Sequence, residues 1–381
     1  MKKQKVVIIG AGVLGLFTAL ELLDNDRYEV DVLDGANPGD GSSGRSVGMV
    51  ETQYFTGKDV QVRAFARDVF SDLEENHGVG FTHCGYLRLG KSEDDMARFQ
   101  ESQKIQAGFG ITDTELLTSA EIANRWPHLI TEDVVGGLYG KWDGYVDGYE
   151  VCQTLARLIR QKGGRVHAGT PALAADFIEG MWQIKTSEAA FDADYVVNAA
   201  GAHAGQVGDM LNAPVPLQPQ LQGAITIKLD GATSGTPFVM DYVPGSGVDG
   251  VYFRSEGKAH LIAGLHTDEI TGDIVDPDMQ LQSVTDEMLE RIAGLLFGRL
   301  QNAEDLQLDR SWQGIYPTTP DLKPIVGKHP DKPGVICALG AGGSGIQLAP
   351  AIARIAAAEI KGENNAGFEI EEDWSAKRLH N

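Results

Sequence analysis

Three glycines near the start of the chain have the spacing that phosphate recognition requires. Gly10, Gly12 and Gly15 form a G-x-G-x-x-G pattern directly after the apolar run of residues 6–9. The first glycine permits a tight turn, the second lets the backbone approach a pyrophosphate, and the third lets a helix pack closely on a strand. The free N–H groups at the start of that helix would face the phosphates. Five residues are expected to contact the phosphate-bearing ligand: Gly10, Gly12, Val13, Leu14 and Gly15.

An acidic residue completes this pattern. Asp34 follows the second apolar run, residues 30–33, where a carboxylate can accept hydrogen bonds from a ribose diol. The alternative is a plain tight turn in which Asp34 caps a loop, but the coincidence of strand, helix and acid favours a dinucleotide site. The pattern serves NAD and FAD equally, so it does not choose between them.

A second glycine-rich turn lies near the end of the chain. Residues 340–345 follow the apolar run 334–339 and precede an Ala/Ile-rich segment with helical character. The N-terminus of a helix at this point would stabilise negative charge on a reduced flavin ring. Taken alone, the segment also fits a connector to a packing helix; taken with the first turn, it favours FAD.

Apolar periodicity indicates the elements that must position these residues. Residues 6–9 and 30–33 are typical of buried parallel strands, and residues 13–23 have helical spacing. Glycine and proline predict turns at Pro244-Gly245 and at Gly257. Further helices are expected at residues 59–76, 148–163, 285–300 and 345–360, and further strands at residues 195–200 and 334–339.

The order of these elements predicts an α/β protein. A Rossmann-type FAD-binding domain is expected to interleave with an α+β substrate-binding domain built on a mixed antiparallel sheet. The FAD-binding domain would comprise residues 1–82, 148–214 and 311–381, and the substrate-binding domain residues 83–147 and 215–310.

Composition narrows the class of protein. The 381 residues carry a formal net charge of -22, which argues against nucleic acid or an anionic membrane as the main partner. No stretch approaches the roughly 20 apolar residues that span a bilayer. The three cysteines are widely separated and lack metal-type spacing, so neither a disulfide framework nor a metal site is expected. These features favour a cytoplasmic protein.

Four segments together resemble the D-amino-acid oxidase and sarcosine oxidase superfamily of FAD enzymes. They are the first glycine turn with Asp34, residues 41–49 (GSSGRSVGM), residues 196–202 (VVNAAGA), and residues 312–321 (WQGIYPTTPD) leading to the Gly340 turn. The resemblance implies a loop wrapped around FAD, adenine near Ala172, and the flavin ring against the second turn. The cofactor contacts that it adds are Ser42, Ser43, Arg45, Ser46, Gly48, Met49, Ala172, Ala200, Gly201, Gly314, Gly343, Ser344, Gly345, Ile346 and Gln347.

Within the superfamily the chain is most similar to sarcosine-oxidase-like enzymes, which oxidise the C–N bond of secondary or N-methyl amino acids. Their active-site tyrosines fall on Tyr252 and Tyr316, and their histidine on His266. Phenols and imidazole can bind a carboxylate or orient an amine. The alternative for each is a structural hydrogen-bonding residue at a strand end.

Two positive charges typical of these enzymes are missing. Glu51 stands where an arginine usually clamps the substrate carboxylate, and Gln347 replaces a lysine in the second turn. A carboxylate at position 51 would favour an ammonium group on the substrate, or it would form a salt link elsewhere. Arg254 is the replacement anchor that the sequence suggests, although it too would fit a structural ion pair.

Other departures concern the reaction. The carboxylate-binding arginine of glycine-oxidase-like and D-amino-acid-oxidase-like members falls on Tyr316, which weakens those two assignments. The lysine that promotes reaction with oxygen falls on Ile262, which favours a dehydrogenase over an oxidase. Gly314 stands where some relatives attach flavin through cysteine, so FAD is expected to bind noncovalently.

The leading interpretation is an FAD-dependent oxidoreductase of amines or amino acids. Hydride would leave a carbon next to nitrogen, the imine would hydrolyse, and oxygen or another carrier would take the electrons. A D-amino-acid or 2-hydroxyacid dehydrogenase is an alternative, the latter with His266 as the base. Another alternative is a flavin-binding subunit of a multi-subunit complex, and an oligomer is compatible with the sequence.

Overall fold

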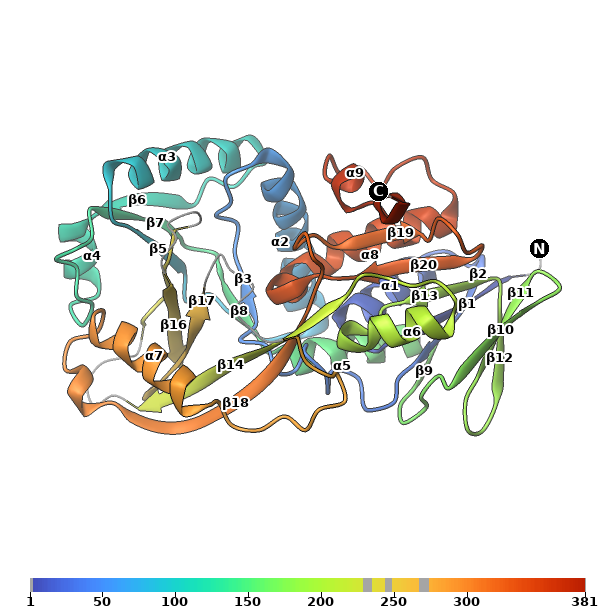
Figure 1. Ribbon diagram of the computed structural model, residues 1–381. Coiled ribbons are helices and arrows are strands. Elements are labelled where there is room, and N and C mark those ends of the chain that lie inside the picture. The colour runs from blue at the N-terminus through green and yellow to red at the C-terminus, as the bar shows by residue number, and fades with distance from the viewer. Residues whose placement is uncertain (1–2, 229–234, 244–248, 267–273, 381) are drawn as a thin grey trace.

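The computed structural model describes residues 3–228, 235–243, 249–266 and 274–380. Figure 1 shows two large sheets side by side, joined by the long strands β14 (Gln218–Lys228) and β18 (Gln307–Thr318). The turn expected at Pro244-Gly245 lies outside the described residues, whereas Gly257 occupies a turn with φ +60°.

The first sheet has six strands in the order β19-β20-β13-β1-β2-β9. Its central strand, β1, pairs in parallel with β2 on one side and β13 on the other, and only β19 runs antiparallel to its neighbour. Burial of both faces explains the unbroken apolar runs. The strands are β1 (Gln4–Ile9), β2 (Tyr28–Leu33), β9 (Arg165–His167), β13 (Tyr195–Asn198), β19 (Ile325–Lys328) and β20 (Val335–Leu339).

Four helices and this sheet share the largest apolar core. Helix α1 packs against both α5 and α8, and α2 packs against α8. Local signals fix their ends: Thr56 caps the start of α2 by accepting from the Asp59 N–H, and Gly78 ends it in the left-handed conformation. The helices are α1 (Val13–Leu23), α2 (Gly57–His77), α5 (Gly148–Gln161) and α8 (Gly345–Lys361).

The second sheet has eight strands in the order β18-β14-β17-β16-β15-β5-β7-β6. Every pairing is antiparallel except that of β15 with β5. Its remaining strands are β5 (Tyr86–Gly90), β6 (Thr114–Thr118), β7 (Gly136–Gly140), β15 (Phe238–Asp241), β16 (Gly250–Glu256) and β17 (His260–His266). The helices of this half are α3 (Glu93–Gly108), α4 (Ser119–Arg125) and α7 (Asp286–Phe297).

Smaller elements complete the fold. One three-stranded sheet contains β3 (Met49–Val50), β8 (Gly144–Val146) and β4 (Phe81–Thr82), and another contains β10 (Ala174–Ile178), β11 (Met181–Lys185) and β12 (Ala190–Ala193). Short helices are α6 (Ala204–Met210), α9 (Glu371–Trp374) and the 3-10 turns Gly201–His203, Ala303–Asp305, Gly342–Ser344 and Ala376–His380.

The expected fold class is confirmed, and so are the helices near residues 59–76 and 285–300, which are α2 and α7. The expected domain boundary between residues 310 and 311 falls inside β18, which pairs with β14 over its whole length in the eight-stranded sheet. The division into two interleaved domains therefore remains a proposal, with β18 crossing from one to the other.

One loop position tests how tightly the chain is packed at the junction of the sheets. Gly48 has φ +73°, and a Cβ there would collide with the carbonyl oxygen of Val146. Gly48→Ala is expected to lower the free energy of unfolding by about 1–3 kcal/mol, because overpacking and backbone strain act together. Urea denaturation measures this. Gly41→Ala, on the same loop but with open space around it, is the control, and equal stability of the two variants would contradict the prediction.

Candidate functional site

A cavity of about 880 Å³ lies where the two sheets meet. The first glycine turn, the end of β2 and the loop of residues 39–47 line one part of it, and β14, β16, β18 and the start of α8 line another. The carboxyl ends of β1 and β2 open into this space, which is where open α/β sheets place their ligands.

The glycine turn has the geometry that its sequence predicts. Gly10 has φ +113°, and a Cβ at that position would collide with the Ala199 carbonyl of β13's loop. A Cβ on Gly15 would collide with the Gly10 carbonyl oxygen. Helix α1 therefore starts as close to β1 as backbone atoms allow. The Val13 N–H donates to Ser43 Oγ at 3.1 Å, which ties the helix start to the next loop.

Asp34 is held in place by the backbone. Its Oδ2 accepts from the Ala11 N–H at 2.6 Å and its Oδ1 from the Ala36 N–H at 2.8 Å. Burial raises the pKa of Asp34, and these two hydrogen bonds offset part of that rise. Each carboxylate oxygen keeps a further lone pair for a donor in the cavity.

The loop of residues 41–48 is fastened to β18. Ser42 Oγ donates to the Ile315 carbonyl at 2.6 Å, and the Trp312 indole N–H donates to the Arg45 carbonyl at 2.9 Å. Within the loop, Ser46 Oγ accepts from the Gly48 N–H at 3.0 Å. These bonds link two segments that the resemblance had placed together on sequence grounds alone.

Two tyrosines stand at the end of the cavity formed by β16, β18 and the second glycine turn. A Cβ on Gly343 would meet the Tyr316 ring, and a Cβ on Gly264 would meet the Tyr252 hydroxyl, so both rings lie against backbone that only glycine permits. Burial raises the pKa of Tyr252 and of Tyr316. Both side chains are therefore neutral phenols at neutral pH, able to donate a hydrogen bond.

Most of the cofactor contacts expected from the sequence line the cavity. They are Gly10, Gly12, Val13, Leu14, Asp34, Ser42, Ser43, Arg45, Ser46, Ala172, Ala200, Gly201, Gly314, Gly343, Gly345 and Ile346. The expected residues outside its lining are Gly15, Gly48, Met49, Ser344 and Gln347. Gly15 and Gly48 act through backbone packing, and Ser344 is the residue before α8.

Of the residues expected to contact the substrate, some line the cavity and others lie outside its lining. Tyr252 and Tyr316 line the cavity, whereas His266, Arg254, Glu51 and Gln347 do not. The His266 side chain is exposed, and its ring packs edge-on against Tyr242 at 4.5 Å.

Arg254 is already committed to other partners. Its Nη1 donates to Glu256 in an ion pair, its Nε and Nη2 donate to the Val47 carbonyl, and its guanidinium carbon lies 3.4 Å from the Tyr145 ring centroid. This is the structural ion pair that the sequence left open as the alternative.

Glu51 lies between the second sheet and α8 and is 1% exposed. Its Oε2 accepts from the Gln53 N–H at 2.5 Å, and its own N–H donates to Gln347 Oε1 at 3.2 Å. Burial raises the pKa of Glu51, and the nearby guanidinium groups of Arg88 and Arg63 offset part of that rise.

The sequence did not indicate a segment that crosses the edge of the cavity. Asp278 accepts from His203 at 3.0 Å and from Gln206 at 3.1 Å, and all three residues line the cavity. The Gln282 N–H donates to Gln313 Oε1 at 2.9 Å. These partners are more than 30 residues apart in sequence, and no local pattern signals such a contact.

Other kinds of site find no support in the described residues. No group of His, Cys, Asp and Glu side chains there is arranged to hold a metal ion. No helix in the described ranges is long and apolar enough to cross a membrane. Cys84, Cys152 and Cys337 all lie outside the cavity lining.

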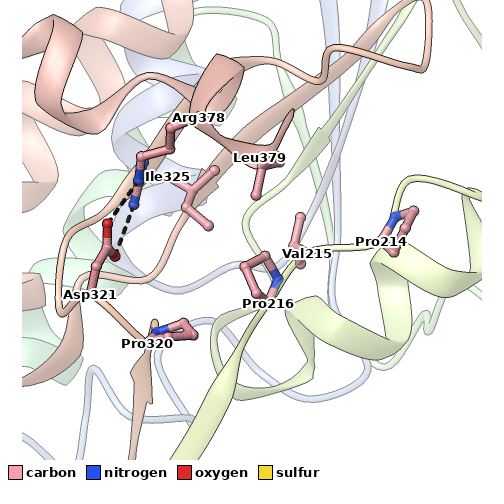
Figure 2. A pocket seen from close by; sticks show the side chains of 8 residues that line it. All are labelled: Pro214, Val215, Pro216, Pro320, Asp321, Ile325, Arg378 and Leu379. Atoms are coloured by element: carbon pink, nitrogen blue, oxygen red, sulfur yellow. Dashed lines mark hydrogen bonds and ion pairs between the residues drawn. The ribbon is translucent and has the colours of Figure 1, made fainter. Parts of the chain in front are cut away.

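A second hollow of about 670 Å³ lies near the C-terminus (Figure 2). Its only charged side chains, Asp321 and Arg378, pair with each other at 3.0 Å, and Arg378 also donates to the Lys323 carbonyl. The remaining lining is apolar or proline, so this hollow offers no group for chemistry. It is formed by Pro214, Val215, Pro216, Pro320, Ile325 and Leu379 in addition to the ion pair.

Known proteins resemble the chain over nearly its whole length. Sarcosine dehydrogenase of Mus musculus is 25% identical over 355 residues, which cover 90% of this chain and 38% of that protein. Glycine oxidase of Geobacillus kaustophilus is 24% identical, with 91% of this chain and 90% of that protein covered. The crystal structure of L-proline dehydrogenase from P. horikoshii has a TM-score of 0.86 and 24% identity, covering 100% of this chain and 98% of that chain.

The chain spans about two fifths of the length of the sarcosine dehydrogenases that it matches. The family described as FAD dependent oxidoreductase (DAO) matches residues 5–359, a range that includes both glycine turns, Asp34 and the two tyrosines. With that match added to the geometry of the cavity, the chain belongs to the DAO family of FAD-dependent oxidoreductases.

Proposed function

We propose that the chain oxidises a C–N bond of a secondary or N-methyl amino acid, or of a related amine, with FAD bound noncovalently in the large cavity. The observation that carries this proposal is the pair of neutral phenols, Tyr252 and Tyr316, beside Gly343 at one end of the cavity. Two hydroxyl donors at that point would orient a small polar substrate without removing its proton.

The residues present fit FAD along the length of the cavity. Asp34 would accept hydrogen bonds from the ribose, and the N–H groups that follow Gly12 would bind the pyrophosphate. The start of α8 at Gly345 would face the flavin ring with its partial positive charge. Since every cysteine lies outside the lining, no thiol is placed to attach the cofactor.

FAD, when bound, supplies the hydride acceptor for the carbon next to nitrogen. The chain's own side chains would orient the substrate and exclude water. Tyr252 packs with Phe238 and Met240 in a buried cluster, and Val47 and Met49 pack against that cluster from the loop. An apolar wall of this kind keeps the reacting carbon dry and strengthens each polar contact made beside it.

A 2-hydroxyacid dehydrogenase is less well supported, because that reaction needs a base for the hydroxyl proton. Among the described residues that line the cavity, the one histidine is His203, which pairs with Asp278 and lies close enough to Asp34 to influence its charge. It therefore belongs to the ribose end and not to the tyrosine end. His266 is exposed outside the lining.

Ile262 supports a dehydrogenase over an oxidase. Ile262 of β17 pairs with Arg254 of β16, so its side chain lies on the sheet face that carries Tyr252. The residue is 7% exposed. An apolar side chain there offers no positive charge to stabilise the anion formed when oxygen takes an electron. A protein or small-molecule carrier is the acceptor that this residue favours.

A larger assembly is the second candidate. The relatives named sarcosine dehydrogenase continue well beyond the region that this chain matches. A flavin-binding unit that acts only with further domains or subunits would also match only part of a longer relative.

A substrate panel tests the proposal directly. The purified yellow protein is titrated without oxygen against N-methyl amino acids, cyclic secondary amino acids such as proline, primary D-amino acids, and 2-hydroxyacids. Bleaching of the flavin band at about 450 nm is expected with secondary amines first. Reduction by hydroxyacids alone would contradict the proposal, and reduction only after other chains are added would favour the assembly.

Asp34 is expected to hold the cofactor. Asp34→Ala should weaken FAD binding by about 10- to 100-fold, the range for one charge-assisted hydrogen bond, as measured by the fluorescence of FAD released on dilution. Asp26→Ala removes an exposed carboxylate outside the cavity lining and is the control, with retention expected to match the parent protein. Equal retention in Asp34→Ala would count against the ribose assignment.

Ile262 is expected to limit reaction with oxygen. Ile262→Lys should speed reoxidation of the reduced protein by air at least about tenfold, because an ammonium group on this face stabilises the developing anion. Stopped-flow absorbance gives the rate. Ile262→Met keeps the site apolar and should leave the rate unchanged, so a similar gain in both variants would assign the effect to loosened packing.

A further inference from the structure

A buried arginine without a counter-ion stands at one end of the wall that carries Tyr252. Arg88, on β5, is 5% exposed. Its Nη1 donates to the Tyr242 carbonyl at 3.3 Å and its Nη2 to the Tyr86 hydroxyl at 3.2 Å, while its Nε has no hydrogen-bond partner. No described carboxylate forms an ion pair with it. A buried guanidinium in this condition is costly unless an anion joins it.

The sheet register places Arg88, which lies outside the cavity lining, on the same sheet face as Tyr252, which is part of that lining. Arg88 pairs with Met240 of β15, which pairs with Tyr252 of β16, so the three side chains lie in one row on the same face. The rings of Tyr86, Phe238 and Tyr252 stack in a parallel row, with centroids 5.5 and 5.7 Å apart. This row leads from the tyrosine end of the cavity to the guanidinium.

Orphaned polar atoms gather around the same arginine. Five buried side-chain atoms in this neighbourhood have no hydrogen-bond partner among the described residues. They are Glu51 Oε1, Gln53 Oε1, Arg63 Nε, Arg88 Nε and Asp143 Oδ2. Buried polar atoms normally have partners, so such a concentration indicates that a polar ligand or ordered water completes the cluster.

Glu51 is the nearest internal candidate for the missing anion, but it makes no ion pair with Arg88. After burial, the charge of Arg88 is the strongest influence on the pKa of Glu51, so the two groups share one electrostatic environment. Gln347 joins this environment to α8, since its Oε1 accepts from the Glu51 N–H while Gly345 and Ile346 of the same helix line the cavity.

We propose that Arg88 anchors a carboxylate of the substrate, with Glu51 as the competing negative charge in the empty site. The positive charge that the resemblance implies in the segment after the loop would here come from Arg88 of β5. This inference rests on the proposed function, because it names the substrate as an amino acid and not as an amine without an acid group. Arg254 is less suited to the role, since Glu256 already neutralises it.

Such an anchor sets the orientation of the substrate. A carboxylate beside Arg88 Nε would gain the bidentate geometry that guanidinium offers. The amine would then point toward Tyr252 and Tyr316.

Equilibrium binding of simple acids tests the anchor without turnover. Acetate, propionate and benzoate, each paired with its neutral amide, are titrated into the FAD-loaded protein while the flavin spectrum is followed. We expect the acids to perturb the spectrum at concentrations at which the amides do not. Arg88→Met should weaken acid binding about 10- to 100-fold, and Arg88→Lys should restore part of it.

Two further variants separate the outcomes. Arg125→Met removes an arginine of α4 that pairs with Glu115 and should bind acids like the parent, whereas loss in Arg254→Met but not in Arg88→Met would overturn the proposal. If Arg88→Met does not fold, Arg88→Lys and the comparison of acids with amides still decide the matter. Because the titration needs no oxidation, a protein that oxidises no amine yet binds acids through Arg88 would refute the proposed function and leave the anchor standing.

The variant Glu51→Gln tests independently whether Glu51 competes with a bound acid for Arg88. Removing the competing charge while keeping the shape should tighten acid binding several-fold, because Arg88 then lacks any internal anion. FAD retention is measured in the same samples and should not change. Weaker or unaltered binding of acids in Glu51→Gln would show that Glu51 is not the competing charge.

Discussion

The close approach of α1 to β1 is the contact on which the rest of the structure depends. It requires backbone against backbone: Gly10 against Ala199, and Gly15 against Gly10. Any side chain at these positions would push the helix away from the sheet and move the floor of the cavity with it. The apolar run of β1 is buried between β2 and β13, and Val6 and Ile8 belong to the same apolar core as α1. All other walls of the site are positioned relative to this floor.

The second sheet reaches that floor through β14 and β18. These strands, of eleven and twelve residues, pair with each other along their length, and the loop of residues 41–48 is hydrogen-bonded to β18 at Ile315 and Trp312. The loop is therefore held by the start of α1 at Val13 and by the second sheet at β18. A cavity bounded in this way has walls from both ends of the sequence, so its shape is a property of the whole chain.

What the sequence could predict follows from how local each signal is. The close approach within the glycine turn and the position of Asp34 at the end of β2 depend on residues a few positions apart, so the sequence could indicate them. The tyrosines could be found only by resemblance, because Tyr252 and Tyr316 lie on strands that meet through β17 and β14. The contact of Asp278 with His203 spans 75 residues and has no local signature.

Charge shows most clearly why a substitution cannot be interpreted one position at a time. The resemblance to sarcosine-oxidase-like enzymes implies an arginine where this chain has Glu51, which by itself suggests a reversal of substrate charge. In the structure, the positive charges of Arg63 and Arg88 and the acidic side chain of Asp143 also lie near Glu51. Burial raises the pKa of Glu51, and burial together with the Glu51 charge raises that of Asp143.

Burial makes each of these acids easier to protonate than an exposed carboxyl group, because it raises its pKa. The neighbourhood is therefore cationic whenever the acids hold their protons, and neutral when both have lost them. An anion that enters would therefore meet a net positive charge only while at least one of the two acids is protonated. In the proposed anion site, the charge of Glu51 would thus set how strongly Arg88 attracts an anion.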